Sequence, residues 1–264
     1  MNWAGKTDMR GRTYEALVIA CVSIASTSAQ ASVDTGVEQE KINFRGGSSI
    51  VFSQPLKHNE AKKFGPGWKR AVFLETTGNQ IPLFQMEYFA SATGGLIFAG
   101  SHSLRISPSG NYAVLDVVRG GVVDLGPSGT PEGSSRQYCP VLNTASGCLV
   151  SMQTGELCGG DWSGNADKWL VTGYGYDATE AMVGYGFSEA IDLWGQFSKS
   201  TILNGTAKIK QYLVDNLGVV NMMACEPPTA SNRNSYTLIA RQLIREGDRA
   251  DAAYILKRLG VAAN

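Results

Sequence analysis

Three cysteines, Cys139, Cys148 and Cys158, lie within twenty residues near the middle of the chain, and a further one follows at Cys225. Thiols in this arrangement could bind a metal ion, form a redox centre or cross-link the chain. Zinc sites in proteins typically use Cys-x-x-Cys pairs or nearby histidines, and this segment has neither. The spacing therefore favours two disulfide bonds over a zinc site or free thiols.

Four cysteines can pair in three ways, and the spacing does not choose among them. Each of the three pairings joins the 139–158 segment to Cys225 by one long-range bond. Closing so long a loop contributes about 4 kcal/mol to stability in the chain-entropy model.

The amino terminus has the features of a secretory signal. A ten-residue apolar run at 16–25 follows three basic residues and is followed by Ala29-Gln30-Ala31. We therefore expect a signal peptide over residues 1–31, with cleavage before Ser32 and a periplasmic or secreted product. The apolar run is shorter than the roughly 20 residues that a membrane-spanning helix needs.

Two alternatives concern this segment. Cys21 follows small and branched residues, as lipid attachment would require, and translation from Met9 would give a more regular signal. Soluble export removes Cys21 and leaves an even number of cysteines, which is typical of an oxidising compartment.

The expected mature chain carries 20 Lys and Arg residues against 21 Asp and Glu residues. Nucleic-acid and anionic-membrane binding usually require a basic excess or patch. We therefore expect no nucleic-acid partner. The shortness of the apolar run predicts no transmembrane segment. A hydrophobic content of 43% is sufficient for a substantial core.

Short β-branched and aromatic runs separated by glycine-rich turns, such as 91–95 and 107–111, extend from residue 42 to about residue 187. They predict antiparallel strands. Residues 143–147 have the composition of a hairpin turn, whereas residues 125–137 lack apolar periodicity and favour a loop.

From residue 188 onward the apolar spacing is helical, and residues 234–260 predict a helical hairpin that turns at Gly247. We therefore expect a β-rich domain over 32–187 and a helical segment over 188–264 packed on it. The predicted fold class is α+β, with an antiparallel sheet or sandwich stabilised by disulfides.

Residues 107–115 and 161–171 each place Ser, Gly and Asn before an apolar run. In this they resemble the strand openings of TolB-like β-propeller blades, which implies a propeller. However, about 145 strand-rich residues at roughly 40–45 per blade make fewer blades than a closed ring needs. A sheet packed against helices is the better interpretation.

Several catalytic motifs are absent from the sequence, including G-x-S-x-G, H-E-x-x-H and a phosphate-binding loop that ends in Gly-Lys-Ser/Thr. The two histidines, His58 in a charged run and His102 between predicted strands, are expected to be structural or surface residues. We assign no catalytic residue and favour a function without catalysis.

Oxygen-bearing side chains alternate along one segment, as they do in calcium-binding loops. Alanine and threonine replace the turn glycine and the bidentate glutamate of an EF-hand. We expect no cofactor, with calcium as the weaker alternative. The four candidate ligands are Asp161, Ser163, Asn165 and Asp167.

A glycine–aromatic motif occurs at 173–176 and again at 184–187, and two tryptophans flank the turn before it. The aromatics of the two motifs could pack between paired strands and the two indoles could lie in the core, or these side chains could present flat apolar surface to a partner. The candidate binding residues are Trp162, Trp169, Tyr174, Tyr176, Tyr185 and Phe187.

These features favour an exported protein that binds a protein partner in the envelope, as an inhibitor or immunity protein against an envelope-targeted toxin or hydrolase. A first alternative is a secreted hydrolase of cell-wall or carbohydrate material that uses paired carboxylates. A second is a structural envelope component. The carboxylates available to a hydrolase include Asp116, Asp124, Glu156 and Asp161.

Overall fold

The computed structural model describes residues 38–85, 94–123, 132–173, 175–204 and 207–261. All of them belong to one compact unit, Gly36–Asn264. The predicted signal peptide at 1–31, with Cys21, lies outside the described residues and stays a prediction.

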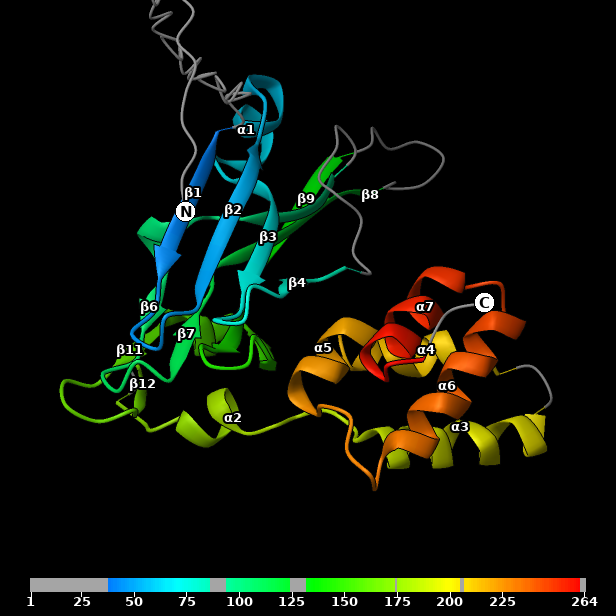
Figure 1. Cartoon of the computed structure of the whole chain (residues 1–264). Helices are drawn as coiled ribbons and strands as arrows, with labels where there is room; N and C mark the ends of the chain where they lie inside the picture. The colour runs from blue at the N-terminus through cyan, green and yellow to red at the C-terminus, as the bar shows by residue number, and fades with distance from the viewer. Residues whose placement is uncertain (1–37, 86–93, 124–131, 174, 205–206, 262–264) are drawn as a thin grey trace, which may run out of the picture. The chain divides into compact units, whose positions relative to one another are not determined.

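An antiparallel sheet of ten strands dominates the first half of this unit (Figure 1). The strands follow the order β1-β2-β3-β5-β8-β9-β7-β6, while β4 pairs with β3 and β10 pairs with β9. A separate two-stranded sheet consists of β11 and β12. The α+β prediction with an antiparallel sheet is confirmed. The strands are β1 (Gln39–Asn43), β2 (Ser49–Pro55), β3 (Trp68–Leu74), β4 (Gln80–Pro82), β5 (Gly94–Phe98), β6 (Arg105–Ile106), β7 (Tyr112–Val114), β8 (Val117–Val123), β9 (Glu132–Asn143), β10 (Leu149–Thr154), β11 (Gly160–Trp162) and β12 (Trp169–Val171).

Apolar residues at every second position form the core of the sheet. Ile50 and Phe52 of β2 are opposite Phe73 and Ala71 of β3, and all four side chains are buried. Since side chains alternate between the two faces of a strand, this spacing directs one face of each strand inward. The register is therefore fixed by burial of that face.

Two glycine pairs lie inside strands and not in turns. Gly94 and Gly95 of β5 are opposite Gly121 and Gly120 of β8, which corrects the turn predicted over 91–95 at Gly94. A Cβ atom on Gly120 would lie 2.8 Å from the ring of Phe64. Glycine therefore permits a close contact at this point of the sheet.

The hairpin predicted at 143–147 is present between β9 and β10, where the N–H of Asn143 donates to the carbonyl of Cys148. The loop predicted over 125–137 is wrong from Glu132 onward, because β9 begins there and pairs with β8. Pairing with a neighbouring strand satisfies the backbone of residues that show no apolar alternation of their own.

Most of the helices follow the sheet in the sequence (Figure 1). The predicted hairpin corresponds to α6 and α7: Gly247 has a φ of 86° at the turn, and the Asp248 side chain caps α7 by accepting from the N–H of Asp251. The helices are α1 (His58–Phe64), α2 (Thr179–Val183), α3 (Ala190–Asn204), α4 (Ile209–Asp215), α5 (Val219–Cys225), α6 (Arg233–Arg245) and α7 (Arg249–Arg258), with short 3-10 turns η1 (Ser101–Ser103) and η2 (Gly155–Gly159).

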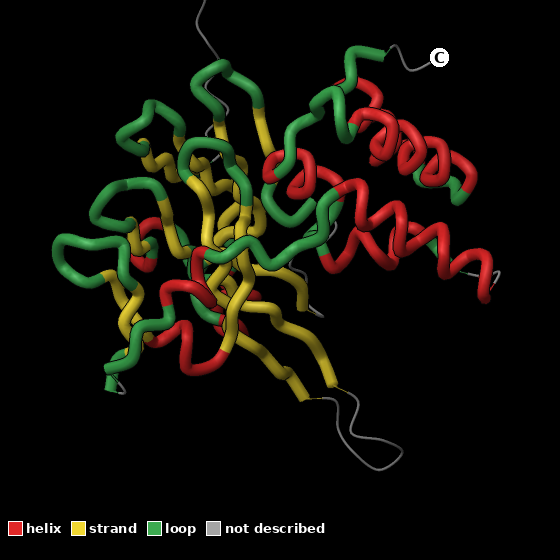
Figure 2. The backbone as a smooth tube through the Cα atoms, turned by 90° about the horizontal axis from the view of Figure 1, so that it is seen from below, coloured by secondary structure: helices red, strands yellow, loops and turns green. Residues whose placement is uncertain are grey.

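Helix α5 joins the helices to the sheet. Its Val220 and Ala224 pack in the core of the sheet, whereas Tyr236 and Ile239 belong to a second core among the helices. Figure 2 shows the strands in yellow gathered together and the C-terminal helices in red grouped next to them. The boundary predicted between a β-rich domain and a helical segment stays a prediction.

Candidate functional site

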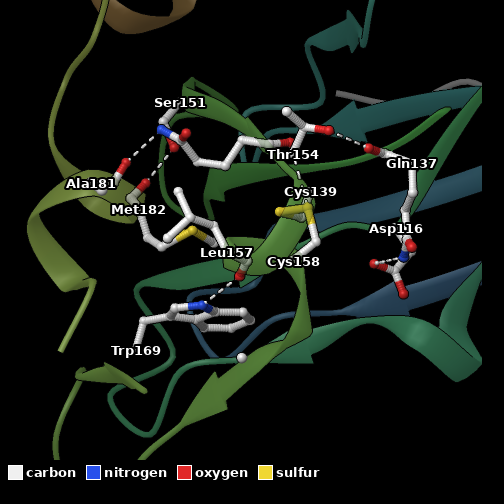
Figure 3. The surroundings of a disulfide bond; sticks show 12 residues. Asp116, Gln137, Cys139, Ser151, Thr154, Leu157, Cys158, Trp169, Ala181 and Met182 are labelled. Atoms are coloured by element: carbon white, nitrogen blue, oxygen red, sulfur yellow. Dashed lines mark hydrogen bonds between the residues drawn. A yellow bond between two sulfur atoms is a disulfide. The ribbon is translucent and has the colours of Figure 1, made fainter. Parts of the chain in front are cut away.

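The four cysteines form two disulfides, Cys139–Cys158 and Cys148–Cys225, with Cα–Cα distances of 5.4 Å and 4.6 Å. The first links β9 to η2 (Figure 3). The second links the residue before β10 to the last residue of α5. The covalent role predicted for these thiols is thus present, and the pairing that spacing left open is resolved.

Arg105 of β6 orders the segment that follows the first disulfide. Its Nη1 donates to the carbonyls of Cys158 and Gly160, each at 2.8 Å. Its Nη2 donates to Oδ1 of Asp116 at 2.8 Å, and its guanidinium group lies 4.8 Å from the centre of the Trp169 ring. No sequence motif singled out this arginine, because the two carbonyls that it binds lie 53 and 55 residues away.

The two candidate tryptophans pack against each other edge to face, with ring centres 5.1 Å apart. Trp169 has no exposed surface, and its indole donates to the carbonyl of Leu157 at 2.8 Å (Figure 3). Trp162 is half-buried and donates to the carbonyl of Arg105. Trp169 is therefore a core residue, with no side-chain surface exposed to a partner.

The four candidate calcium ligands occupy β11 and the turn that follows it. Asp161 accepts from the N–H of Trp162, and Asp167 accepts from the N–H and hydroxyl groups of Ser109. Although burial alone would raise the pKa of Asp167, the hydrogen bonds from Ser109 lower it below its usual value.

Asp167 thus joins the turn at 107–111 to the turn after β11. Over the described ranges, no cluster of three or more His, Cys, Asp or Glu side chains could hold a metal ion. The calcium hypothesis, with Asp161, Ser163, Asn165 and Asp167 as ligands, remains a prediction without further support.

Among the described residues, the two glycine–aromatic motifs do not pair with each other. They precede and follow α2, and the first is bonded to β12 through the Tyr176 carbonyl, so two paired strands made by these motifs are not observed there. Tyr176 and Tyr185 are 44% and 43% exposed, and Phe187 contacts Tyr185 edge to face at 5.7 Å between ring centres. Tyr174 lies outside the described residues.

The loop that carries Tyr185 is bonded to both the sheet and the helices. The N–H groups of Gly186 and Ser188 donate to the Val150 carbonyl and the Asn216 side chain, respectively. Burial, together with the negative charges of Glu226 and Glu189, raises the pKa of Tyr185 to about 12. Its hydroxyl therefore stays protonated at neutral pH and can donate a hydrogen bond.

A shallow, open groove of about 390 Å³ lies beside Tyr176. It contains two acidic residues, Asp177 and Glu180, that the sequence analysis did not single out. Their only signal is that Asp177 directly follows the first glycine–aromatic motif. The groove is lined by Leu157, Tyr176, Asp177, Ala178, Glu180 and Ala181.

The carboxylates proposed for a hydrolase have different surroundings from one another. Asp116 is bound by Arg105 and also accepts from Gln137 at 3.3 Å. Glu156 and Asp161 are exposed. Asp124 lies outside the described residues, and no catalytic pair is defined by these contacts.

In comparisons with known proteins, no family model matches the chain, and no curated protein or solved structure is significantly similar to it. A search of the described residues finds no helix with the length and apolar character needed to cross a bilayer.

Proposed function

We propose that this protein is exported and binds another protein of the cell envelope, acting as an inhibitor or immunity protein against a toxin or hydrolase. The observation that carries the proposal is the exposure of Tyr176 and Tyr185, at 44% and 43%, beside a covalently linked core. Aromatic side chains are enriched among the residues that dominate protein interfaces. A rigid scaffold that presents such residues from loops is typical of binding proteins.

The attachment of these aromatics supports the proposal. The Tyr176 carbonyl accepts from the N–H of Val171 in β12, and Gly186 is bonded to β10. Contacts held in place before binding lose less conformational freedom on association. The segment around α2 is therefore suited to act as a preformed surface.

The charge of the same segment indicates the kind of partner. Residues 169–198 contain four acidic residues and no lysine or arginine. Lys168, just before this segment, pairs with Asp177, so the segment carries an acidic excess and not charges of a single sign. Such an excess favours a partner of the opposite sign and accelerates the encounter. We therefore expect the partner to present a basic surface. The acidic residues are Asp177, Glu180, Glu189 and Asp192.

The two disulfides support an extracytoplasmic location, because such bonds persist mainly in oxidising compartments. The predicted signal peptide is consistent with that location. The hydrolase alternative has less support, since Asp116 is held by Arg105. The structural-component alternative predicts self-assembly.

The proposal can be tested by capture of a partner from envelope extract with the disulfide-bonded protein, followed by an affinity measurement on the captured partner. Tyr185→Ala should weaken binding at least tenfold, whereas Ile244→Ala, which truncates a 48%-exposed residue of α6, should leave it unchanged. The captured partner should also lose its enzymatic or toxic activity when bound.

Two results would contradict the proposal. Turnover of cell-wall fragments by the purified protein, with no specific partner, would favour the hydrolase. Concentration-dependent self-assembly in sedimentation experiments, again without a partner, would favour a structural component.

A further inference from the structure

The groove beside α2 combines an apolar floor with acidic residues. At the groove Leu157 of η2 is half-buried and Ala178 is buried, whereas Ala181, Asp177 and Glu180 are exposed. Tyr176 contributes an aromatic side chain that is 44% exposed. An apolar, aromatic and anionic lining is complementary to a cationic side chain with a hydrocarbon stem.

Asp177 is held in place and kept ionised. Its Oδ1 accepts from the hydroxyl and the N–H of Thr179, and these hydrogen bonds lower the pKa of Asp177 below its usual value. Its backbone pairs with Leu170 of β12. The carboxylate is therefore charged and positioned before any ligand arrives.

A cation of the chain itself already lies at this carboxylate. Nζ of Lys168 is 3.9 Å from Oδ2 of Asp177, and the two side chains are 62% and 45% exposed. Exposed ion pairs of this kind contribute little to stability, so a competing cation can replace the lysine at small cost. Lys168 therefore shows that the Asp177 carboxylate can pair with the ammonium group of a lysine side chain.

We infer that this groove binds a lysine or arginine side chain of the partner protein. The cation would lie between Asp177, Glu180 and the Tyr176 ring, and its methylene groups would contact Leu157 and the alanines. This inference rests on the proposed function for the existence of a partner, and it adds the chemistry that the partner must present at this point.

The binding of single side chains tests the inference directly. Nα-acetyl-lysine methylamide, which keeps its ε-ammonium group, and its uncharged analogue Nα-acetyl-norleucine methylamide are titrated into the disulfide-bonded protein. The backbone amides are followed by NMR. The lysine compound should perturb residues 176–181 and Leu157, with an affinity at least fivefold above that of the norleucine compound. Because norleucine has the hydrocarbon chain of lysine without its ammonium group, the difference between the two affinities measures the contribution of the charge.

Three variants sharpen this measurement. Asp177→Asn keeps an acceptor for Thr179 and should reduce the lysine affinity to the norleucine level. Lys168→Met removes the competing cation and should strengthen lysine binding. Asp215→Asn, at an exposed carboxylate of α4, should have no effect. Unchanged amide spectra elsewhere in each variant would show that the fold is kept.

Equal affinities for the two compounds, or shifts only outside the groove, would overturn the inference. So would an Asp177→Asn variant that binds lysine at full strength. If the lysine compound binds but envelope extract yields no partner, the inference that the groove binds a cationic side chain is upheld and the proposed function fails. If a partner is captured with full affinity by Asp177→Asn, the proposed function stands and the role of the groove fails.

Discussion

At the scale of single residues, Asp251 is a carboxylic acid whose surroundings disfavour its charged form. It lies in the first turn of α7 and is only 6% exposed. Burial, together with the negative charge of Asp248, raises the pKa of Asp251 above its usual value, and Lys210 offsets this only in part. The folded protein therefore retains this proton at a higher pH than the unfolded chain does.

This difference predicts a pH-dependent gain from Asp251→Asn. The raised pKa means that the stability supplied by the protonated form is present at low pH and is lost as pH rises through the folded pKa. Asparagine cannot ionise, so the variant should melt at a higher temperature than the parent at pH 7. The gain should disappear near pH 3, where both forms are uncharged.

Thermal unfolding at the two pH values measures this effect, with Asp215→Asn as the exposed control. An equal gain at pH 7 and pH 3 would show that ionisation of Asp251 is not the cause.

The role of a residue could be recognised from the sequence only where that role does not depend on long-range contacts in the folded protein. The cysteine cross-links could be predicted, because parity and spacing constrain thiols directly. Trp169 and Tyr185 could not be separated, since one is buried and the other exposed only through long-range packing. Arg105 had no sequence signal, although it holds Asp116.

At the scale of elements, the β11–β12 hairpin packs without space for a side chain at one position. A Cβ atom on Gly160 would collide with the Trp169 indole and would lie 2.7 Å from the carbonyl oxygen of Leu170. A Cβ atom on the adjacent Gly159 would meet nothing within 4 Å. Neither glycine has a positive φ, so the contrast between them is steric.

We therefore predict opposite outcomes for two neighbouring alanine substitutions. Gly160→Ala should destabilise the protein by about 1–3 kcal/mol, because a buried indole and a backbone carbonyl must move. Gly159→Ala should change stability by less than about 0.5 kcal/mol, as is usual at open surface positions. Urea unfolding monitored by tryptophan fluorescence compares them, and equal losses would contradict the tight packing of Gly160.

The elements themselves were predictable where pattern and burial coincide. The alternation in β2 and β3 and the helical spacing of α6 and α7 each match a buried face. The start of β9 was not predictable, because residues from Glu132 onward owe their conformation to pairing with β8. Gly94 of β5 was assigned to a turn although it, too, pairs with β8.

At the scale of the whole described unit, the sheet core and the helical core meet at α5. Asn221 accepts from the N–H of Leu149 at 2.8 Å and donates to its carbonyl at 3.1 Å, as a neighbouring strand would. Cys148 and Cys225 bond at the same junction. Because these partners lie 72 and 77 residues apart, the junction depends on long-range closure.

This arrangement predicts unequal effects from removal of the two disulfides. In the chain-entropy model, loss of Cys148–Cys225, with a separation of 77 residues, costs about 4 kcal/mol, against about 3 kcal/mol for Cys139–Cys158, with a separation of 19. The double variant Cys148→Ala with Cys225→Ala should therefore unfold at lower urea concentration than Cys139→Ala with Cys158→Ala. Hydrogen exchange should locate the early opening at α5 and β10 in the first variant. The Cys148/Cys225 variant could instead lose no more stability than the Cys139/Cys158 variant. In that case Asn221 and the apolar contacts of α5 hold the junction without the covalent bond.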